Sequence, residues 1–112
     1  MTNKHVLKKN WEFKAVLAAR KQVVSKNLII YYVPSEIFQV GISIPKQFAN
    51  AVMRNHYRNQ IRAIIRELDK TNILFRTIII ARKTFLSLDF KTKQQEIKNL
   101  YERIVKNGKR KV

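Results

Sequence analysis

The alternation of apolar and polar residues along the chain predicts three β-strands. The segment NLIIYYV (27–33) is rich in β-branched and aromatic residues, which favours a strand, and Pro34 ends it. In VGISI (40–44) every second residue is a large aliphatic one, so we expect a second strand that pairs with 27–33 as a hairpin. RTIIIARK (76–83) has a continuous apolar centre, which indicates a third, buried strand. KQVVS (21–25) is compatible with a small additional strand.

Helical periodicity predicts three helices between and around these strands. A first short helix can be capped by Asn10, and a second helix starts after Asn50 as its cap and runs to about Asp69. Asp89 can cap a last helix, which we expect to end at Gly108. The first helix has an apolar face formed by Phe13, Val16 and Leu17. The last has an apolar stripe formed by Phe90, Ile97, Leu100, Tyr101 and Ile104.

The predicted order of elements is α-β-β-α-β-α, with the small strand at 21–25 as an optional addition. This order describes an α+β protein, an α/β sandwich in which helices pack on a sheet. The chain has 112 residues, a length that suits one domain, and no repeat or Gly/Ser-rich linker divides it. We therefore predict a single domain over residues 1–112, with short basic tails at both ends.

The charge of the chain is strongly one-sided. Lys and Arg number 24 against 7 Asp and Glu, which gives a formal net charge of +17. Because such a surface repels itself, a polyanion is its natural partner, with nucleic acid the first candidate and an anionic membrane surface the second. Cysteine is absent, and no apolar run is long enough to cross a bilayer. We expect a soluble, cytoplasmic protein without disulfides or a membrane partner.

The segment NAVMRNHYRNQIRAIIREL (50–68) repeats arginine at every fourth position. On a helix its apolar stripe should face the sheet and comprises Met53, Tyr57, Ile61, Ile64 and Leu68. The opposite side carries a row of cations, the arginine row, formed by Arg54, Arg58, Arg62 and Arg66. Each pair of like charges four residues apart costs about 0.2–0.5 kcal/mol unless an anion neutralises it. Guanidinium groups bind phosphate oxygens in pairs, and Asn55 and Asn59 can contact sugars and bases.

These residues also resemble a known family. GISIPKQFANAVMRNHYRNQIRAIIREL (41–68) resembles the signature of the bacterial ribonuclease P protein subunit, in which Asn-Ala-Val precedes Arg-Asn and further basic residues. LKKNWEFKAV (7–16) is similar to the N-terminal segment of that family, and IIIARK (78–83) to its fourth strand. The chain departs from the pattern at His56, where the family usually has Arg, and at Asn59, where it has a basic residue.

The resemblance implies that a large catalytic RNA hydrolyses precursor tRNA with bound divalent magnesium. The protein would bind that RNA as a monomer in a 1:1 complex and would hold no cofactor of its own. Carried over to this sequence, the RNA-binding residues are Lys46, Arg54, Asn55, His56, Arg58, Asn59, Arg62 and Arg66. The resemblance further implies the fold of the second domain of ribosomal protein S5 with a left-handed βαβ crossover, although the general rule favours a right-handed one.

The resemblance also implies a cleft between the first helix and the sheet that holds the single-stranded 5′ leader of precursor tRNA. Its residues in this sequence are Phe13, Leu17 and Tyr31. Aromatic side chains beside cations are suitable platforms on which unpaired bases stack. Judged from the residues alone, packing in the core is the more common use of such side chains.

Other functions find less support in the sequence. The seven acidic residues are scattered and His56 has no carboxylate within helical reach, so we predict no catalytic or metal-binding residue in the protein. A helix-turn-helix DNA-binding protein would need two adjacent helices, whereas strands flank the arginine helix. The main alternative is a non-enzymatic RNA-binding protein of the ribosome or of another structured RNA.

Overall fold

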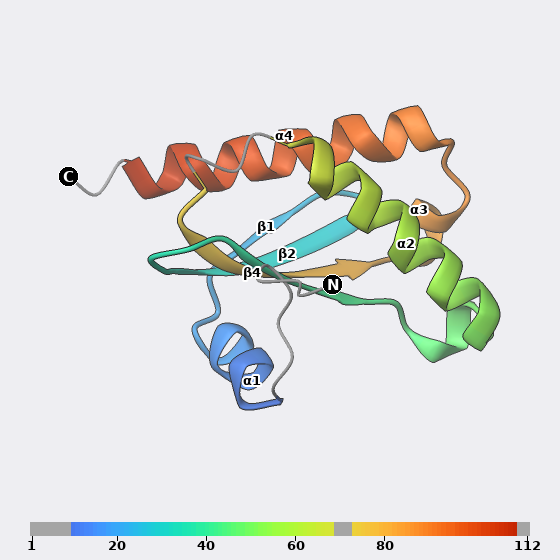
Figure 1. Cartoon of the computed structure of the whole chain (residues 1–112), viewed down its shortest axis with the longest axis horizontal. Helices are drawn as coiled ribbons and strands as arrows, with labels where there is room; N and C mark the ends of the chain where they lie inside the picture. Colours follow the sequence, from blue (N-terminus) through green and yellow to red (C-terminus); the bar gives the residue numbers. More distant parts are fainter. Residues whose placement is uncertain (1–9, 69–72, 110–112) are drawn as a thin grey trace.

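The computed structural model describes residues 10–68 and 73–109, which form a four-stranded sheet with helices on both faces (Figure 1). In chain order the elements are α1 (Asn10–Ala18), β1 (Gln22–Val24), β2 (Leu28–Pro34), β3 (Gln39–Ser43), the 3-10 helix η1 (Lys46–Phe48), α2 (Ala51–Glu67), β4 (Phe75–Ala81), α3 (Lys83–Leu86) and α4 (Phe90–Lys109). Every predicted strand and helix is present, including the optional strand near residue 23. The short elements η1 and α3 were not predicted. The mixed α+β class is confirmed.

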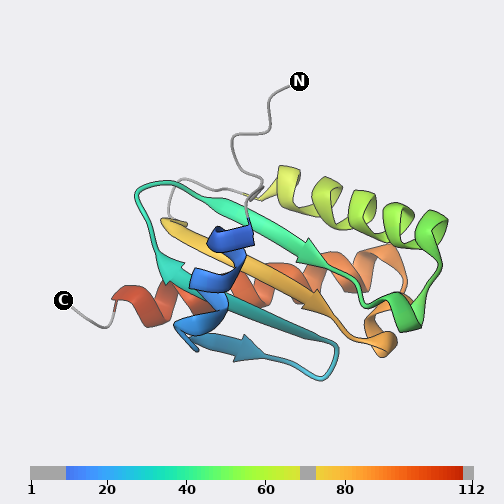
Figure 2. The same cartoon turned by 90° about the horizontal axis from the view of Figure 1, so that it is seen from below.

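The strands lie in the order β1-β2-β4-β3. β2 is antiparallel to β1 and to β4, whereas β3 runs parallel to β4 (Figure 2). The predicted hairpin between 27–33 and 40–44 is therefore wrong, because β4 lies between these two strands. β4 suits the centre of the sheet because its side chains are buried on both faces. Its buried residues are Phe75, Thr77, Ile78, Ile79 and Ala81.

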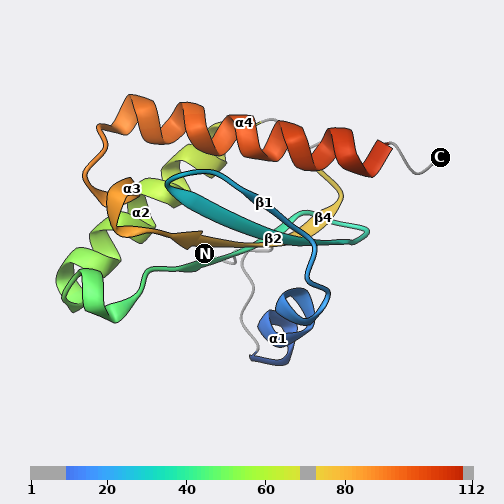
Figure 3. The same cartoon turned by 180° about the vertical axis from the view of Figure 1, so that it is seen from behind.

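Helices α2 and α4 cover one face of the sheet, and α1 covers part of the other (Figure 3). The main core lies between the sheet and the helix pair, and its fully buried members include Leu28, Ile30, Ile61, Ile79 and Ile97. A second, smaller cluster lies under α1. Strands β3 and β4 and the intervening α2 form a parallel βαβ unit. The left-handed crossover and the likeness to the ribosomal S5 domain stay predictions.

The predicted start of α2 is confirmed, because Asn50 Oδ1 accepts a hydrogen bond from the Met53 N–H at 2.9 Å. Most of the predicted apolar stripe packs on the main core: Tyr57, Ile61, Ile64 and Leu68. Met53 was assigned wrongly to this stripe, since 38% of its side chain is exposed. Met53 belongs to the first turn of α2, which follows η1 at one end of the molecule (Figure 1). Ile65 is buried although the predicted stripe omitted it.

The predicted start of α4 is also confirmed. Asp89 Oδ1 accepts a hydrogen bond from the Thr92 N–H at 3.2 Å, and hydrogen bonding by Thr92 lowers the pKa of the Asp89 carboxyl. Four predicted stripe residues are buried: Ile97, Leu100, Tyr101 and Ile104. Phe90 is 44% exposed and does not belong to the stripe, because it is the first residue of the helix. The predicted end at Gly108 is too early by one residue, since the helix continues to Lys109.

The start of α1 differs slightly from the prediction. Asn10, predicted as the cap, is itself helical, and the residues before it lie outside the described part of the chain. Within residues 10–68 and 73–109, none of the helices has the length and apolar character needed to cross a membrane.

Candidate nucleic-acid interface

The polar side of α2 carries the arginine row and its neighbours. The exposed members are Asn55, His56, Asn59, Arg62 and Arg66, and the half-buried ones are Arg54 and Arg58. Arg54 Nη1 donates to the Ala49 carbonyl at 3.1 Å, so this arginine also ties α2 to the segment before it. Arg62 Nη1 donates to Asn59 Oδ1 at 3.4 Å. Both acceptors are neutral and leave the positive charge of these two side chains available to an anion.

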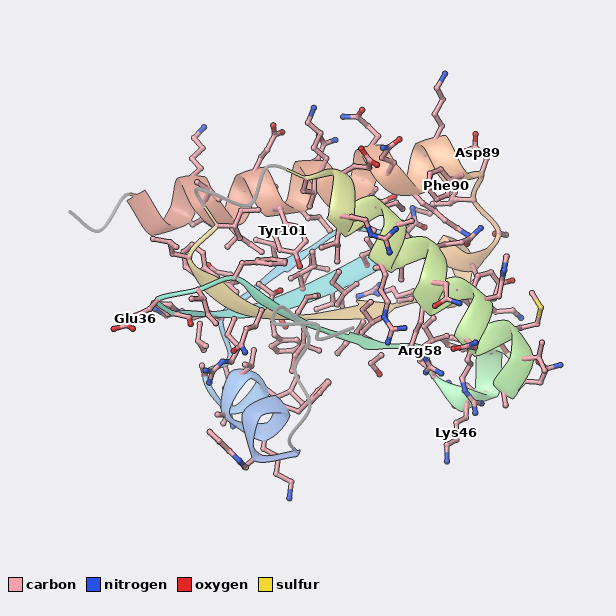
Figure 4. The ribbon with its side chains drawn as sticks, in the orientation of Figure 1. Glu36, Lys46, Arg58, Asp89, Phe90 and Tyr101 are labelled. Atoms are coloured by element: carbon pink, nitrogen blue, oxygen red, sulfur yellow. The ribbon has the colours of Figure 1, made fainter. Side chains whose placement is uncertain are left out.

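Lys46 and His56 extend this polar face at the start of α2. Figure 4 shows Lys46 on η1, at the same end of the molecule as the first turn of α2, with Arg58 farther along the helix. The Lys46 side chain is exposed. The ring of His56 lies 5.5 Å from that of Tyr57, centre to centre, in a tilted arrangement. The residues predicted to bind the catalytic RNA therefore lie on α2 and on the 3-10 helix that leads into it.

A second surface lies where α1 crosses the opposite face of the sheet (Figure 2). We call it the α1 cluster, and its members are Phe13, Val16, Tyr31, Val33, Ile78 and Ile80. Val16 is fully buried against Ile78 and anchors the helix, while Phe13 and Tyr31 stay partly exposed. Two of the three residues predicted for the leader cleft are thus brought together. Leu17 is 38% exposed and lies outside the cluster, because Phe13 and Val16 already occupy the sheet-facing side of this short helix.

Gly41 makes the close approach of α1 to the sheet possible. Tyr31, Ile78 and Gly41 are direct neighbours across β2, β4 and β3. A Cβ atom placed on Gly41 would lie so close to Cζ of Phe13 that the ring or the strand would have to shift. The Phe13 ring therefore lies against the bare backbone of β3. Sequence analysis missed this role, although an isolated glycine inside a strand is a known sign of close approach.

We expect Gly41→Ala to lower the free energy of unfolding by about 1–3 kcal/mol, the usual cost of an overpacked site. Without the clash, alanine would favour a strand more than glycine does. In a Phe13→Ala background the same change should therefore cost almost nothing or stabilise the fold. Urea unfolding of the two single variants and the double variant measures this coupling. Equal costs in both backgrounds would contradict the proposed contact between the ring and Gly41.

The described residues offer no evident metal centre. Among residues 10–68 and 73–109, no group of three or more His, Cys, Asp or Glu side chains could hold a metal ion. Glu96 accepts hydrogen bonds from Ser25 and Asn27 and ties α4 to the turn between β1 and β2. The prediction that the protein itself holds neither a metal nor a cofactor stays a prediction.

The fold and these two surfaces define a small basic α+β protein with a cationic helix face and an aromatic-lined sheet face. The model of the Ribonuclease P protein family matches residues 1–105. The chain is 50% identical to the ribonuclease P protein component of Mycoplasmopsis pulmonis over 106 residues, 94% of this chain and 95% of that one. It is 47% identical to the ribonuclease P protein component of Mycoplasma mobile over 112 residues, 100% and 99% of the two chains.

A solved structure shows the same fold. The RNase P protein of Staphylococcus aureus superposes with a TM-score of 0.81 at 24% identity, over 91% of this chain and 96% of that one. The chain therefore belongs to the ribonuclease P protein family, the protein subunits of an endoribonuclease that processes tRNA. The sequence left two leading hypotheses, a ribonuclease P subunit and a non-enzymatic RNA-binding protein of the ribosome or of another structured RNA. Family membership favours the first.

Proposed function

We propose that this subunit binds the catalytic RNA of ribonuclease P through α2 and holds the 5′ leader of precursor tRNA against the α1 cluster. The observation that carries the proposal is the separation of two chemically different surfaces by one sheet. The arginine row belongs to a helix on one face, and Phe13 with Tyr31 lies on the other (Figure 1). One protein can then contact a folded RNA and a single strand at the same time.

The arginine row suits the backbone of a folded RNA. Arg58, Arg62 and Arg66 lie one helical turn apart, about 6 Å from one to the next along the helix. Phosphate groups that accept two hydrogen bonds from each guanidinium would remove the repulsion within the row. Asn55 and Asn59 beside the row both donate and accept hydrogen bonds and can therefore contact sugars and base edges.

The α1 cluster suits a single strand. Phe13 and Tyr31 are partly exposed aromatic side chains set in an apolar floor that includes Val16 and Ile78. A base stacked on such a ring gains about 1–3 kcal/mol without a strong preference for sequence. Leu17, exposed beside the cluster, would offer an apolar contact to a further nucleotide but no ring.

We assign hydrolysis of the phosphodiester bond between the 5′ leader and the mature tRNA to the RNA subunit. Divalent magnesium, which would supply Lewis-acid chemistry in such a reaction, belongs to the RNA-based holoenzyme in this proposal. The contribution of the protein is to neutralise phosphate charge and to increase the affinity for precursor tRNA. It does so as a monomer, one protein to one RNA, in the cytoplasm.

Reconstitution tests the proposed function. At a magnesium concentration too low for the catalytic RNA alone, adding the purified protein should restore cleavage of precursor tRNA at the mature 5′ end. Lys and Arg side chains of the protein neutralise RNA phosphates. They thereby replace part of the metal ions that otherwise reduce the repulsion between the catalytic RNA and its substrate. A protein heated past unfolding and a basic protein of equal charge serve as controls. Failure of the native protein to restore cleavage, or equal restoration by the basic control, would contradict the proposal.

A further inference from the structure

The two halves of α2 are held by different contacts. The buried residues of the helix are Ile61, Ile64 and Ile65, all in its second half. None of residues 51–60 is buried, and Val52 and Met53 are 77% and 38% exposed. This first half nevertheless carries the cations nearest the start of the helix, Arg54 and Arg58. Apolar burial alone therefore does not explain how the first half is kept in place.

Lys93 of α4 supplies a polar contact to this first half, in addition to the Asn50 cap, the hydrogen bond from Arg54 to the Ala49 carbonyl and the packing of Tyr57 on the main core. The Lys93 side chain is only 2% exposed, and its Nζ donates a hydrogen bond to Oε1 of Gln60 at 2.7 Å. The same ammonium group lies 4.9 Å from the centre of the Tyr57 ring and 5.5 Å from that of Phe85 in α3. Tyr57 and Gln60 are three residues apart and so lie on the same side of α2. One cation thus contacts both of them and α3 as well.

A buried cation is a costly way to fill this space. Its hydrogen-bond partner is a neutral amide, and burial lowers the pKa of Lys93, although the charge of Asp89, which caps the start of α4, offsets part of this effect. An apolar side chain of similar length commonly replaces such a group at no loss of stability. Lysine can instead fix the position of α2 relative to α4, because its ammonium group holds an amide oxygen and a ring face at defined distances.

We propose that Lys93 is a positioning residue for RNA binding, which fixes the first half of α2 through Tyr57 and Gln60. Both residues are close in sequence to members of the arginine row. Tyr57 directly precedes Arg58, and Gln60 lies two residues before Arg62. Holding them on α4 sets the rotation of the helix and therefore the direction of the arginines. This inference rests on the proposed binding of the catalytic RNA by α2.

Lys93→Met tests the inference, with Lys98→Met as the matched control. Methionine keeps the length and apolar packing of the lysine but loses the ammonium group. Lys98 is exposed on the same helix, so its replacement removes the same formal charge from a solvated position. We expect Lys93→Met to weaken binding of the catalytic RNA about 10-fold and to leave the melting temperature unchanged or raised. Lys98→Met should weaken binding less than 2-fold.

A second variant removes the contact without changing the net charge. Gln60→Ala leaves Lys93 in place but deletes the acceptor of its hydrogen bond, and we expect a loss of RNA affinity of about 3-fold to 10-fold. Amide hydrogen exchange gives an independent readout in both variants. Exchange should become faster in residues 51–60 and stay unchanged in β2 and β4, because only the first half of α2 is released.

The possible outcomes separate this inference from the proposed function. If Arg58→Ala weakens RNA binding while Lys93→Met and Gln60→Ala do not, Lys93 has no positioning role and the proposed function stands. If Arg58→Ala leaves RNA binding unchanged, α2 is not the RNA-binding face and the proposed function fails. If Lys93→Met lowers the melting temperature and speeds exchange throughout the sheet, the lysine is a general structural residue and the inference is wrong.

Discussion

Replacing Arg58 and Arg62 together by alanine is expected to weaken binding of the catalytic RNA about 100-fold while the fold stays intact. Hydrogen bonds to charged groups contribute about 1.5–3 kcal/mol each, so the loss of one arginine corresponds to about a 10-fold change in affinity or more. Neither side chain is buried, and the hydrogen bond from Arg62 to Asn59 is local to α2. Arg54 is left in place because its hydrogen bond to the Ala49 carbonyl also supports the start of the helix.

Titration of the RNA at several salt concentrations measures this effect. Two lost phosphate contacts should flatten the slope of log affinity against log salt by about 1.4 to 1.8 units. The matched control removes two exposed cations from α4 with Lys98→Ala and Lys106→Ala, which should change affinity only a few-fold. Equal losses in both double variants would indicate that net charge alone drives binding. A large fall in melting temperature for Arg58→Ala and Arg62→Ala would show a structural role for the row.

Local sequence pattern was sufficient to predict the elements of this fold but not their neighbours. The strands and main helices were predicted because alternation and helical periodicity, with Asn50 and Asp89 as caps, are properties of short segments. The pairing of β2 with β4 depends on a segment more than 40 residues away in sequence. Adjacent strands often form hairpins, so the local pattern favoured the wrong partner for β2. The burial of β4 on both faces was the signal that it takes the centre of the sheet.

Local sequence pattern was also insufficient to predict the surroundings of single residues. Ideal helical angles placed Met53 and Phe90 on apolar stripes, but both lie at helix starts and are 38% and 44% exposed. The contact between Phe13 and Gly41 joins the first helix to the third strand, and the contact between Lys93 and Gln60 joins two helices. Neither partner can be inferred from the segment that contains the other. Long-range contacts of this kind decide where side chains point, and the sequence alone does not display them.

Phe13→Leu and Tyr31→Leu are expected to weaken capture of precursor tRNA by the assembled enzyme without affecting its assembly. Leucine keeps apolar contact with Val16 and Ile78 of the α1 cluster but removes the ring face on which a base can stack. A lost stacking contact costs about 1–3 kcal/mol, which corresponds to a decrease of about 5-fold to 150-fold in affinity for each variant. Binding of the catalytic RNA should stay within 2-fold of the parent, because α2 lies on the opposite face of the sheet.

Comparison of precursor tRNA with mature tRNA decides whether the α1 cluster contacts the leader. Mature tRNA has no leader, so its affinity for the holoenzyme should be the same with the parent protein, Phe13→Leu or Tyr31→Leu. Phe90→Leu is the matched control, since it removes an exposed ring at the start of α4, outside the α1 cluster, and should affect neither tRNA. If Phe13→Leu weakened both forms of tRNA equally while assembly stayed normal, the rings would contact the tRNA body or support the fold, and the leader assignment would be wrong. A loss confined to precursor tRNA, and growing as the leader is lengthened from one nucleotide to several, would locate the single strand on these two rings.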